Sequence, residues 1–435
     1  MKAIFLLSLL HTSLAAVSGT FDILAFNVAG LPAILNGNDV PGDKATNTEI
    51  IGSRFAEYGF DIIHVQEDFN YHAYLYSTDT HAYRTATSGG VPFGSGLNTL
   101  SNFPWIDFER VQWDSCSNAS GADCLTPKGF SVMRVRVDEG VYVDCYNLHA
   151  DAGRRPLSTR SANLQQVADY IAASSTGNAV LVFGDTNARY TTANENIRVF
   201  QTQEDMVNPW VELILSGVEP TEGTDAVVCG NPSTTAECET VDKIFYRGSR
   251  ALTLQATAWA YEDENFLNNG SILSDHNPVS SSFSWSKSDA FRLSDLYGGP
   301  HGTWFNSLPS LPTGNPNLKT TTVFLAASSR LDSISLTLST GTTTTHGGTG
   351  GTASELTLAD DEYWTGTKLC QGQYNGHTRI FYMAVTTSQG NVVEAGTETE
   401  ECVEWVAEEG WGGVGVWGRS GDEVDMLGVV YAPLG

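Results

Sequence analysis

Five apolar runs that each end in a short polar string most constrain the fold of this chain. The strings are FNVAGLP, HVQED, NLHADAG, GDTNAR and LSDHNP. Strands of a layered sheet protein end at a shared edge, where the loops that follow them collect polar side chains. Carboxylates, carboxamides and imidazoles gathered at such an edge suit a hard divalent cation and a phosphodiester. The pattern therefore predicts a sheet-based hydrolase.

The spacing of apolar residues predicts helices between these runs. Over residues 21–285, strand-like runs such as DIIHVQE and NAVLVFGD alternate with TEIIGSRFAEYG and SANLQQVADYIAAS, which have apolar residues at helical spacing. Strands interleaved with helices favour an α/β or α+β sandwich.

A change of composition after residue 285 predicts a second domain. The rest of the chain is rich in Thr, Ser and Gly, and its strand-like pieces are separated by Gly-rich turns. A chain of 435 residues is long enough for two cores. We predict a first domain over residues 19–285, a linker over 286–292 and an all-β domain over 293–435.

The N-terminal segment 1–18 has the pattern of a secretory signal peptide. Lys2 precedes the apolar run 3–10, and small residues follow near Ala16. No later stretch has the length of a transmembrane helix. We expect a secreted, extracellular protein.

The seven cysteines fit an oxidising compartment. Three pairs lie close in sequence and are the expected disulfides: Cys116 with Cys124, Cys229 with Cys238, and Cys370 with Cys402. Cys145 is left over within the run VYVDCYNLH, and we expect a buried free thiol there.

The charge of the chain argues against an extended nucleic-acid surface. Its 23 Lys and Arg residues against 50 Asp and Glu residues give a net charge of −27. A basic face that would release counterions from nucleic acid is therefore missing from the sequence. Nucleic acid is a less favoured partner, although a metal ion and a few arginines can neutralise one phosphate.

The order Asn, Glu, His, Asp-x-Asn and Asp-His over the first domain resembles the endonuclease/exonuclease/phosphatase superfamily. The resemblance implies an α+β four-layer sandwich of two β-sheets flanked by helices. It also implies a metal-dependent phosphodiester hydrolase. Glu67 takes the place of the direct Mg²⁺ ligand, with Asn27 and Asp275 completing the metal group. Mn²⁺ and Co²⁺ are alternatives to Mg²⁺.

The same resemblance implies the catalytic roles. His276 is the general base, Asp242 orients its imidazole, and His149 faces the phosphate as a cation or proton donor. Asp185 positions the attacking water and Asn187 donates to a phosphate oxygen. We expect pKa values near neutrality for both histidines. We also expect Asp185 and Asn187 to share one strand face, with a turn as the alternative.

The string ETVDKIFYR makes the first domain most similar to the secreted neutral sphingomyelinases. The resemblance implies a phospholipase C acting on a phosphosphingolipid such as sphingomyelin, with peripheral contact to a membrane surface. The aromatic run Phe69, Tyr71, Tyr74 and Tyr76 could face a choline group, or belong to the core. Two alternatives are a secreted nuclease that uses the same site and a non-catalytic glycan-binding protein.

The second domain resembles a jacalin-related lectin, which implies a β-prism of three sheets. The resemblance rests on YGGPHG, HGGTGG, RIFYMAVTTSQG and WGRSGDEVDMLGVVY. It implies a carbohydrate site formed by Gly299, Gly421, Asp422, Glu423 and Asp425, because carboxylates and backbone N–H groups bind sugar hydroxyls. The alternative is a lectin-shaped domain that has lost binding. Pro300 and His301 alter the first Gly-rich string, so no sugar preference carries over.

Overall fold

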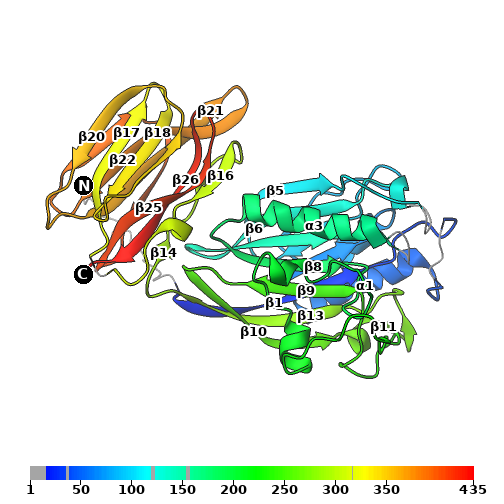
Figure 1. Cartoon of the computed structure of the whole chain (residues 1–435). Coiled ribbons are helices and arrows are strands. Elements are labelled where there is room, and N and C mark those ends of the chain that lie inside the picture. Colours follow the sequence, from blue (N-terminus) through cyan, green and yellow to red (C-terminus); the bar gives the residue numbers. More distant parts are fainter. Residues whose placement is uncertain (1–15, 36–38, 119–122, 153–156, 316) are drawn as a thin grey trace, which may run out of the picture.

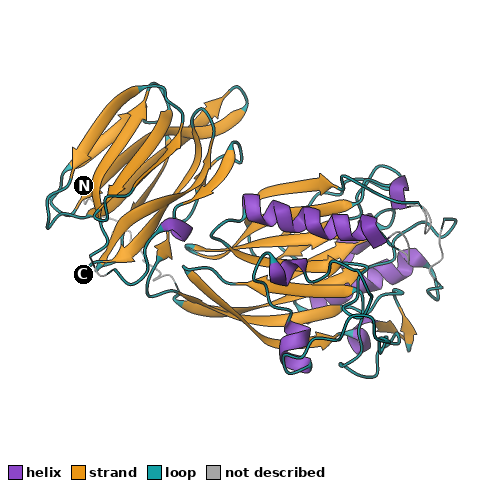
Figure 2. Ribbon diagram, in the orientation of Figure 1, coloured by secondary structure: helices purple, strands orange, loops and turns teal. Residues whose placement is uncertain are grey.

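The computed structural model describes residues 16–435 except 36–38, 119–122, 153–156 and 316. Figure 1 shows two regions side by side: a sandwich of sheets and helices, and a C-terminal region of strands. Figure 2 shows nearly all of the helix in the sandwich. Both predicted fold classes are confirmed.

The first sheet of the sandwich has six strands in the order β10-β13-β1-β2-β4-β3. Their bounds are β1 (Ser18–Asn27), β2 (Ile62–Gln66), β3 (Tyr83–Arg84), β4 (Asn98–Ser101), β10 (Leu252–Tyr261) and β13 (Val279–Lys287). β1 pairs in parallel with β2 and antiparallel with β13. This central strand is covered on both faces, which explains its continuous apolar run.

The second sheet has five strands in the order β5-β6-β7-β8-β9. Their bounds are β5 (Trp105–Gln112), β6 (Gly129–Asp138), β7 (Val141–Leu148), β8 (Ala179–Asp185) and β9 (Asp242–Arg247). Only β7 and β8 pair in parallel. The ends of β7 and β8 therefore meet at one edge, together with the start of β9.

Two long helices form the outer layers of the sandwich. α1 (Lys44–Tyr58) begins at the N-cap Asp43, whose carboxylate accepts from the Thr46 N–H, and ends at the left-handed Gly59. Its apolar face packs on the side of β1 that carries Leu24 and Phe26. α3 (Leu157–Ser174) packs on the second sheet, and the inner faces of the two sheets meet in the same core. The result is four layers.

Shorter elements connect these layers. They are α2 (His72–Thr78), α4 (Val199–Thr202), the hairpin of β11 (Leu267–Asn268) and β12 (Ser271–Ile272), 3₁₀ turns at Asp123–Leu125 and Asp263–Phe266, and a π-helical turn at Trp210–Ile214.

The C-terminal region is a prism of three antiparallel sheets around one apolar core. The first contains β14 (Arg292–Leu293), β15 (Tyr297–Gly298), β16 (Thr303–Asn306), β25 (Trp411–Ser420) and β26 (Val424–Pro433); a 3₁₀ turn, Leu308–Ser310, follows β16. The second contains β17 (Thr320–Ala327), β18 (Leu331–Leu338), β19 (Thr343–Gly347) and β20 (Thr352–Thr357). The third contains β21 (Trp364–Tyr374), β22 (His377–Thr387), β23 (Val392–Gly396) and β24 (Glu401–Val406).

An apolar and charged interface joins the two regions. Tyr142 of β7 packs edge-on against Trp417, and both belong to a core cluster with residues from both regions. The Arg134 guanidinium lies 3.5 Å from the ring centroid of Trp304. These contacts involve the start of β7 and the second half of β6, away from the edge that carries the polar strings.

The predicted disulfides Cys116–Cys124, Cys229–Cys238 and Cys370–Cys402 are present, and Cys145 is a buried free thiol. No helix among the described residues is long and apolar enough to cross a bilayer. Most of the predicted signal peptide lies outside the described residues. The predicted domain boundaries stay predictions.

Candidate active site

The two sheets bring five of the predicted site residues to one edge. Asn27 is the last residue of β1, and Glu67 directly follows β2. His149 follows β7, Asp185 ends β8, and Asp242 begins β9 opposite Asp185. The parallel pairs β1–β2 and β7–β8 explain this arrangement, because parallel strands end on the same side.

Asp185 is the centre of the cluster. Its Oδ2 accepts from the Asn27 Nδ2 at 3.1 Å, and lies 3.4 Å from the His149 Nε2 and 3.8 Å from the His276 Nε2. Burial, with a smaller contribution from Asp242, raises the pKa of Asp185 to about 6, against the opposing effect of His276. A carboxylate in this position can hold a water molecule between two imidazoles.

His276 and Asp242 form a dyad. The His276 Nδ1 lies 2.9 Å from the Asp242 Oδ2, which also accepts from the Thr240 hydroxyl. Burial lowers the pKa of His276, but Asp242 and Asp185 outweigh it and hold this pKa well above its usual value. With Nδ1 donating to Asp242, Nε2 is the nitrogen that faces Asp185.

His149 has the opposite electrostatics. Burial, followed by the charges of Lys128 and His276, holds the pKa of His149 well below its usual value. The Lys128 Nζ lies 3.2 Å from the His149 Nε2. The expectation that both histidines titrate near neutrality is therefore wrong, because burial lowers the pKa of His149 whereas two carboxylates raise the pKa of His276. A neutral His149 leaves the positive charge here to Lys128.

The surroundings of Glu67 fit a hard cation. Glu67 adopts a left-handed backbone with φ 56°, which is uncommon outside glycine, and its Oε2 is buried with no hydrogen-bond partner among the described residues. Glu67 and Asp275 both act on the Lys44 ammonium, whose pKa is lowered by burial and raised by these two acids. The Asn27 Oδ1 accepts from the Ala29 N–H. Oxygen donors of this kind suit Mg²⁺.

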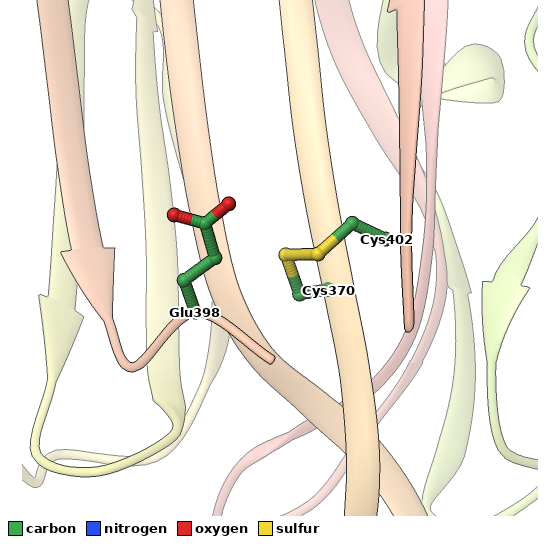
Figure 3. Close-up of side chains that lie close together, drawn as sticks. All are labelled: Cys370, Glu398 and Cys402. Atoms are coloured by element: carbon green, nitrogen blue, oxygen red, sulfur yellow. A yellow bond between two sulfur atoms is a disulfide. The ribbon is translucent and has the colours of Figure 1, made fainter. Parts of the chain in front are cut away.

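A second group, Asp185, Asp242 and His276, also has ligand atoms within 4.8 Å of one another. The hydrogen bond between His276 and Asp242 accounts for this closeness without an ion. A further group, Cys370, Glu398 and Cys402, is not a metal site, because its two sulfur atoms form a disulfide (Figure 3).

Asn187 does not continue the strand as expected. β8 ends at Asp185, and Asn187 has φ 51° with its N–H donating to the Asp185 Oδ1. This local bond turns the chain, and short polar side chains favour such turns. The Asn187 amide nitrogen donates to the Ala150 carbonyl. The expected shared strand face is therefore wrong, and a turn places Asn187 beside the cluster.

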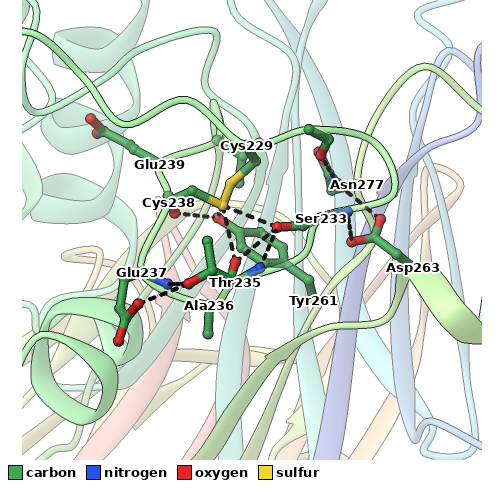
Figure 4. The surroundings of a disulfide bond; sticks show 12 residues. Cys229, Ser233, Thr235, Ala236, Glu237, Cys238, Glu239, Tyr261, Asp263 and Asn277 are labelled. Carbon is green, nitrogen blue, oxygen red and sulfur yellow. Dashed lines mark hydrogen bonds between the residues drawn. A yellow bond between two sulfur atoms is a disulfide. The ribbon is translucent and has the colours of Figure 1, made fainter.

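The Cys229–Cys238 disulfide loop supports the string that carries His276 (Figure 4). The Asn277 amide donates to the Gly230 carbonyl and to Asp263, and the Asn231 amide donates to the Ser274 carbonyl. The Ser274 hydroxyl donates to the Asn27 carbonyl. The disulfide loop and β1 thus hold this string from two sides.

Sequence reasoning missed four buried residues around the site: Lys44, Gln66, Asn147 and Lys128. Lys44 donates to the Ala29 and Leu31 carbonyls and fixes the loop after β1. Gln66 donates to Asn147 at 2.7 Å and links the sheets beneath the site. Lys128 lies at the start of β6. The sequence offered one signal for these residues: a lysine or a side-chain amide within or next to an apolar run, in a chain that has few basic residues.

The aromatic run after Glu67 does not form one surface. Phe69 is 3% exposed and the Tyr76 hydroxyl donates to the Thr85 carbonyl, so both belong to the interior. Tyr71 and Tyr74 pack on each other, and Tyr74 is 43% exposed. A choline cage made of all four rings is absent from the structure.

The predicted sugar loop is folded back on itself. The Gly299 N–H donates to the Asp425 carbonyl, and a Cβ on Gly302 would lie 2.6 Å from the Asp425 Oδ2. Glu423 forms ion pairs with Arg330 and Arg379, and the Gly421 N–H donates to the Glu423 carbonyl. Asp425 is buried, whereas Gly421 and Asp422 are exposed. The glycines thus let the backbone approach the Asp425 carboxylate closely.

Comparison with protein families identifies both regions. The profile of Endonuclease/Exonuclease/phosphatase family 2 matches residues 44–217, and that of the Jacalin-like lectin domain matches residues 294–430. The chain therefore combines an endonuclease/exonuclease/phosphatase-type domain with a jacalin-like lectin domain.

Curated relatives match part of the chain. Sphingomyelinases of Mycobacterium tuberculosis (strain ATCC 25618 / H37Rv) and Mycobacterium bovis (strain ATCC BAA-935 / AF2122/97) are each 38% identical over 277 residues, which cover 62% of this chain and 54% of the relative. The chain spans about half the length of these relatives.

Solved structures match each region separately. Malaysian banana lectin is 25% identical and covers 32% of this chain and 97% of its own, with a TM-score of 0.29. Humanized D. rerio TDP2 is 17% identical and covers 61% of this chain and 98% of its own, with a TM-score of 0.46.

Proposed function

We propose that this protein is a divalent-metal-dependent phosphodiesterase that hydrolyses a phosphosphingolipid, with sphingomyelin as the leading substrate. The observation that carries the proposal is the buried Asp185, which lies between two histidines and accepts from Asn27, with the His276–Asp242 dyad beside it. The similarity to sphingomyelinases supports the substrate class.

In the proposed reaction, water attacks phosphorus in line with the leaving oxygen. Asp185 holds the water, and the Nε2 of neutral His276 accepts its proton while Nδ1 donates to Asp242. Before it can accept a proton, His276 must lose the one that its raised pKa favours. A divalent cation held by Glu67, Asp275 and Asn27 would favour the neutral form of His276 by charge repulsion.

The remaining residues stabilise charge that develops on the phosphate. The Asn27 and Asn187 amides and the Lys128 ammonium are the donors assigned to the phosphate oxygens. A divalent cation held by Glu67, Asp275 and Asn27 would neutralise charge on a phosphate oxygen and on the leaving oxygen. The Nε2 of neutral His149 accepts from Lys128 and keeps this ammonium group at the edge of the site.

The test is hydrolysis by the purified full chain with Mg²⁺. Vesicles of sphingomyelin, vesicles of phosphatidylcholine and plasmid DNA are supplied separately. We expect release of phosphocholine from sphingomyelin, loss of activity in EDTA, and recovery with Mg²⁺, Mn²⁺ or Co²⁺. The variant His276→Ala should lose activity by about 10³-fold or more.

Three outcomes would contradict the proposal. Cleavage of DNA alone would make the protein a nuclease. Activity that persists in EDTA would contradict the proposed dependence on a divalent metal. Activity that is absent on all substrates, or unaffected by His276→Ala, would favour a non-catalytic glycan-binding protein.

We further propose that the protein is secreted and that its lectin domain binds glycans, which raises enzyme concentration at a glycosylated membrane surface. The three disulfides and the jacalin-like domain support this. Asp425→Asn should abolish binding on a glycan array, whereas the exposed Asp360→Asn should not. Equal binding by both variants, or no binding by the unaltered chain, would contradict glycan recognition at this loop.

A further inference from the structure

A polar cleft opens beside the catalytic cluster. It has a volume of about 690 Å³ and shares His276 and Asn187 with the site described above. Most of its other polar lining residues come from the loop after β8 and from the start of α3. They are Arg160, Arg189, Thr191, Thr192, Glu195 and Asp225. The described lining contains no aromatic ring.

The two arginines of the cleft differ in their partners. Arg160 is buried and pairs with Glu195. Glu195 also accepts from the backbone N–H of Arg189 at 2.7 Å, but not from its side chain. The Arg189 Nε is buried, and no hydrogen bond or ion pair joins its guanidinium to another described residue. In a chain with a net charge of −27, an arginine that pairs with no described residue is available to bind an acceptor in this cleft.

The position of the cleft decides which part of the substrate it takes. In an in-line displacement the leaving oxygen departs opposite the attacking water. The cleft is lined by His276, the proposed base, and so it lies on the side from which water attacks. The ceramide oxygen leaves on the opposite side. The headgroup oxygen stays on phosphorus in an equatorial position, so the headgroup, and not the ceramide, is the group that can extend into the cleft.

We propose that this cleft binds a polyhydroxylated headgroup, such as a cyclitol, and that Arg189 determines this specificity. Guanidinium, hydroxyl and carboxylate groups together donate to and accept from vicinal hydroxyls. A quaternary ammonium group is instead recognised by aromatic faces and is repelled by an arginine. This inference rests on the proposed function, and ranks a phosphosphingolipid with a polyol headgroup above sphingomyelin as a substrate of the same site.

The first experiment measures binding of the headgroup phosphate without catalysis. The full chain is titrated calorimetrically with myo-inositol 1-phosphate and with phosphocholine. We expect inositol phosphate to bind at least about tenfold more tightly, and Arg189→Ala to remove that advantage, with partial rescue by Arg189→Lys. The matched control is Arg54→Ala on the exposed face of α1, whose arginine pairs only with Glu57. Equal affinities, or equal weakening of both ligands by Arg189→Ala, would overturn the inference.

The second experiment separates this inference from the proposed function. Vesicles that contain ceramide phosphoinositol or sphingomyelin are supplied with Mg²⁺, and the ratio of kcat/KM values is measured. A ratio of about ten or more in favour of ceramide phosphoinositol, reduced by Arg189→Ala, supports the inference. A preference for sphingomyelin overturns it and leaves the hydrolase in place. If neither lipid is cleaved, the proposed function fails, while Arg189-dependent binding of inositol phosphate still supports the cleft.

Discussion

The two ends of the five-stranded sheet use buried charge in opposite ways. At the end that faces the lectin domain, Asp107 forms ion pairs with Arg134 and Arg419, each at an N–O distance of 2.7 Å. Asp295 forms an ion pair with Arg136. At the end that carries the candidate site, Asp185 meets an amide and two imidazoles, and none of the described residues brings a guanidinium to it.

This difference suggests that the charges at the interface stabilise the fold, whereas those at the other end serve the proposed reaction. Burial lowers the pKa of Arg134, but Asp144 and Asp107 outweigh it and fix the charged form. At the other end burial raises the pKa of Asp185 to about 6 and leaves the Glu67 Oε2 without a partner. Paired charges hold the interface between the sandwich and the lectin domain in one arrangement, whereas incompletely paired charges are available to bind an ion or transfer a proton.

The largest expected effect comes from Glu67→Gln. We expect activity to fall about 10³-fold or more, because a cation ligand is lost. The free energy of unfolding should stay constant or rise, because the change removes a buried carboxylate oxygen that has no partner. Turnover assays and denaturant unfolding measure the two effects. A large loss of stability with retained activity would mean that Glu67 stabilises the fold and is not a cation ligand.

Asp107→Asn should show the reverse pattern. The substitution removes the carboxylate partner of Arg419 and one of the two carboxylate partners of Arg134, which keeps Asp144. We expect a loss of about 1–3 kcal/mol in the free energy of unfolding. Activity per folded molecule should be retained, because Asp107 lies at the far end of the sheet. Asp114→Asn, at an exposed position, is the control. A loss under about 0.5 kcal/mol for Asp107→Asn would mean that this interface is not locked by its charges.

The disulfide loop beneath His276 should affect both properties. The double variant Cys229→Ser/Cys238→Ser should lose about 2–3 kcal/mol of stability and lower kcat roughly tenfold, because Asn277 loses its support from the loop. The pair Cys370→Ser/Cys402→Ser in the lectin domain should lose stability alone. Calorimetry and turnover distinguish the two, and an equal loss of kcat in both pairs would exclude a role in positioning.

His64 provides the smallest effect and shows a buried histidine without a catalytic role. Its ring stacks on Phe183 at 3.6 Å, and burial lowers its pKa to about 3. The unfolded chain binds a proton near pH 6.5, so this contribution to stability is present above that pH and is lost as the pH falls toward 3. His64→Phe should remove up to about 1.4 kcal/mol per pH unit from the acid slope of the free energy of unfolding. An unchanged slope would contradict the assignment.

Predictions from the sequence were most accurate where a residue lies at the end of a single strand, or where two cysteines lie close together in the sequence. Asn27, Glu67 and Asp185 terminate or follow apolar runs, and the fold brings them to one edge. Asn187 was misplaced because a local hydrogen bond to Asp185 overrides strand continuation. The opposite pKa shifts of His149 and His276 were missed because they depend on the burial of each ring and on neighbours such as Lys128, which the sequence does not place beside His149.

The sequence by itself determined the two fold types, the close cysteine pairs and the polar residues at the strand ends, because periodicity, composition and short spacings are local properties. Tertiary structure alone decided which carboxylates meet a guanidinium and which face an imidazole. It also decided that Lys128 adjoins His149 and that Arg189 faces a cleft. Charge interactions depend on distance and burial in space, and neither quantity is encoded in any single stretch of the chain.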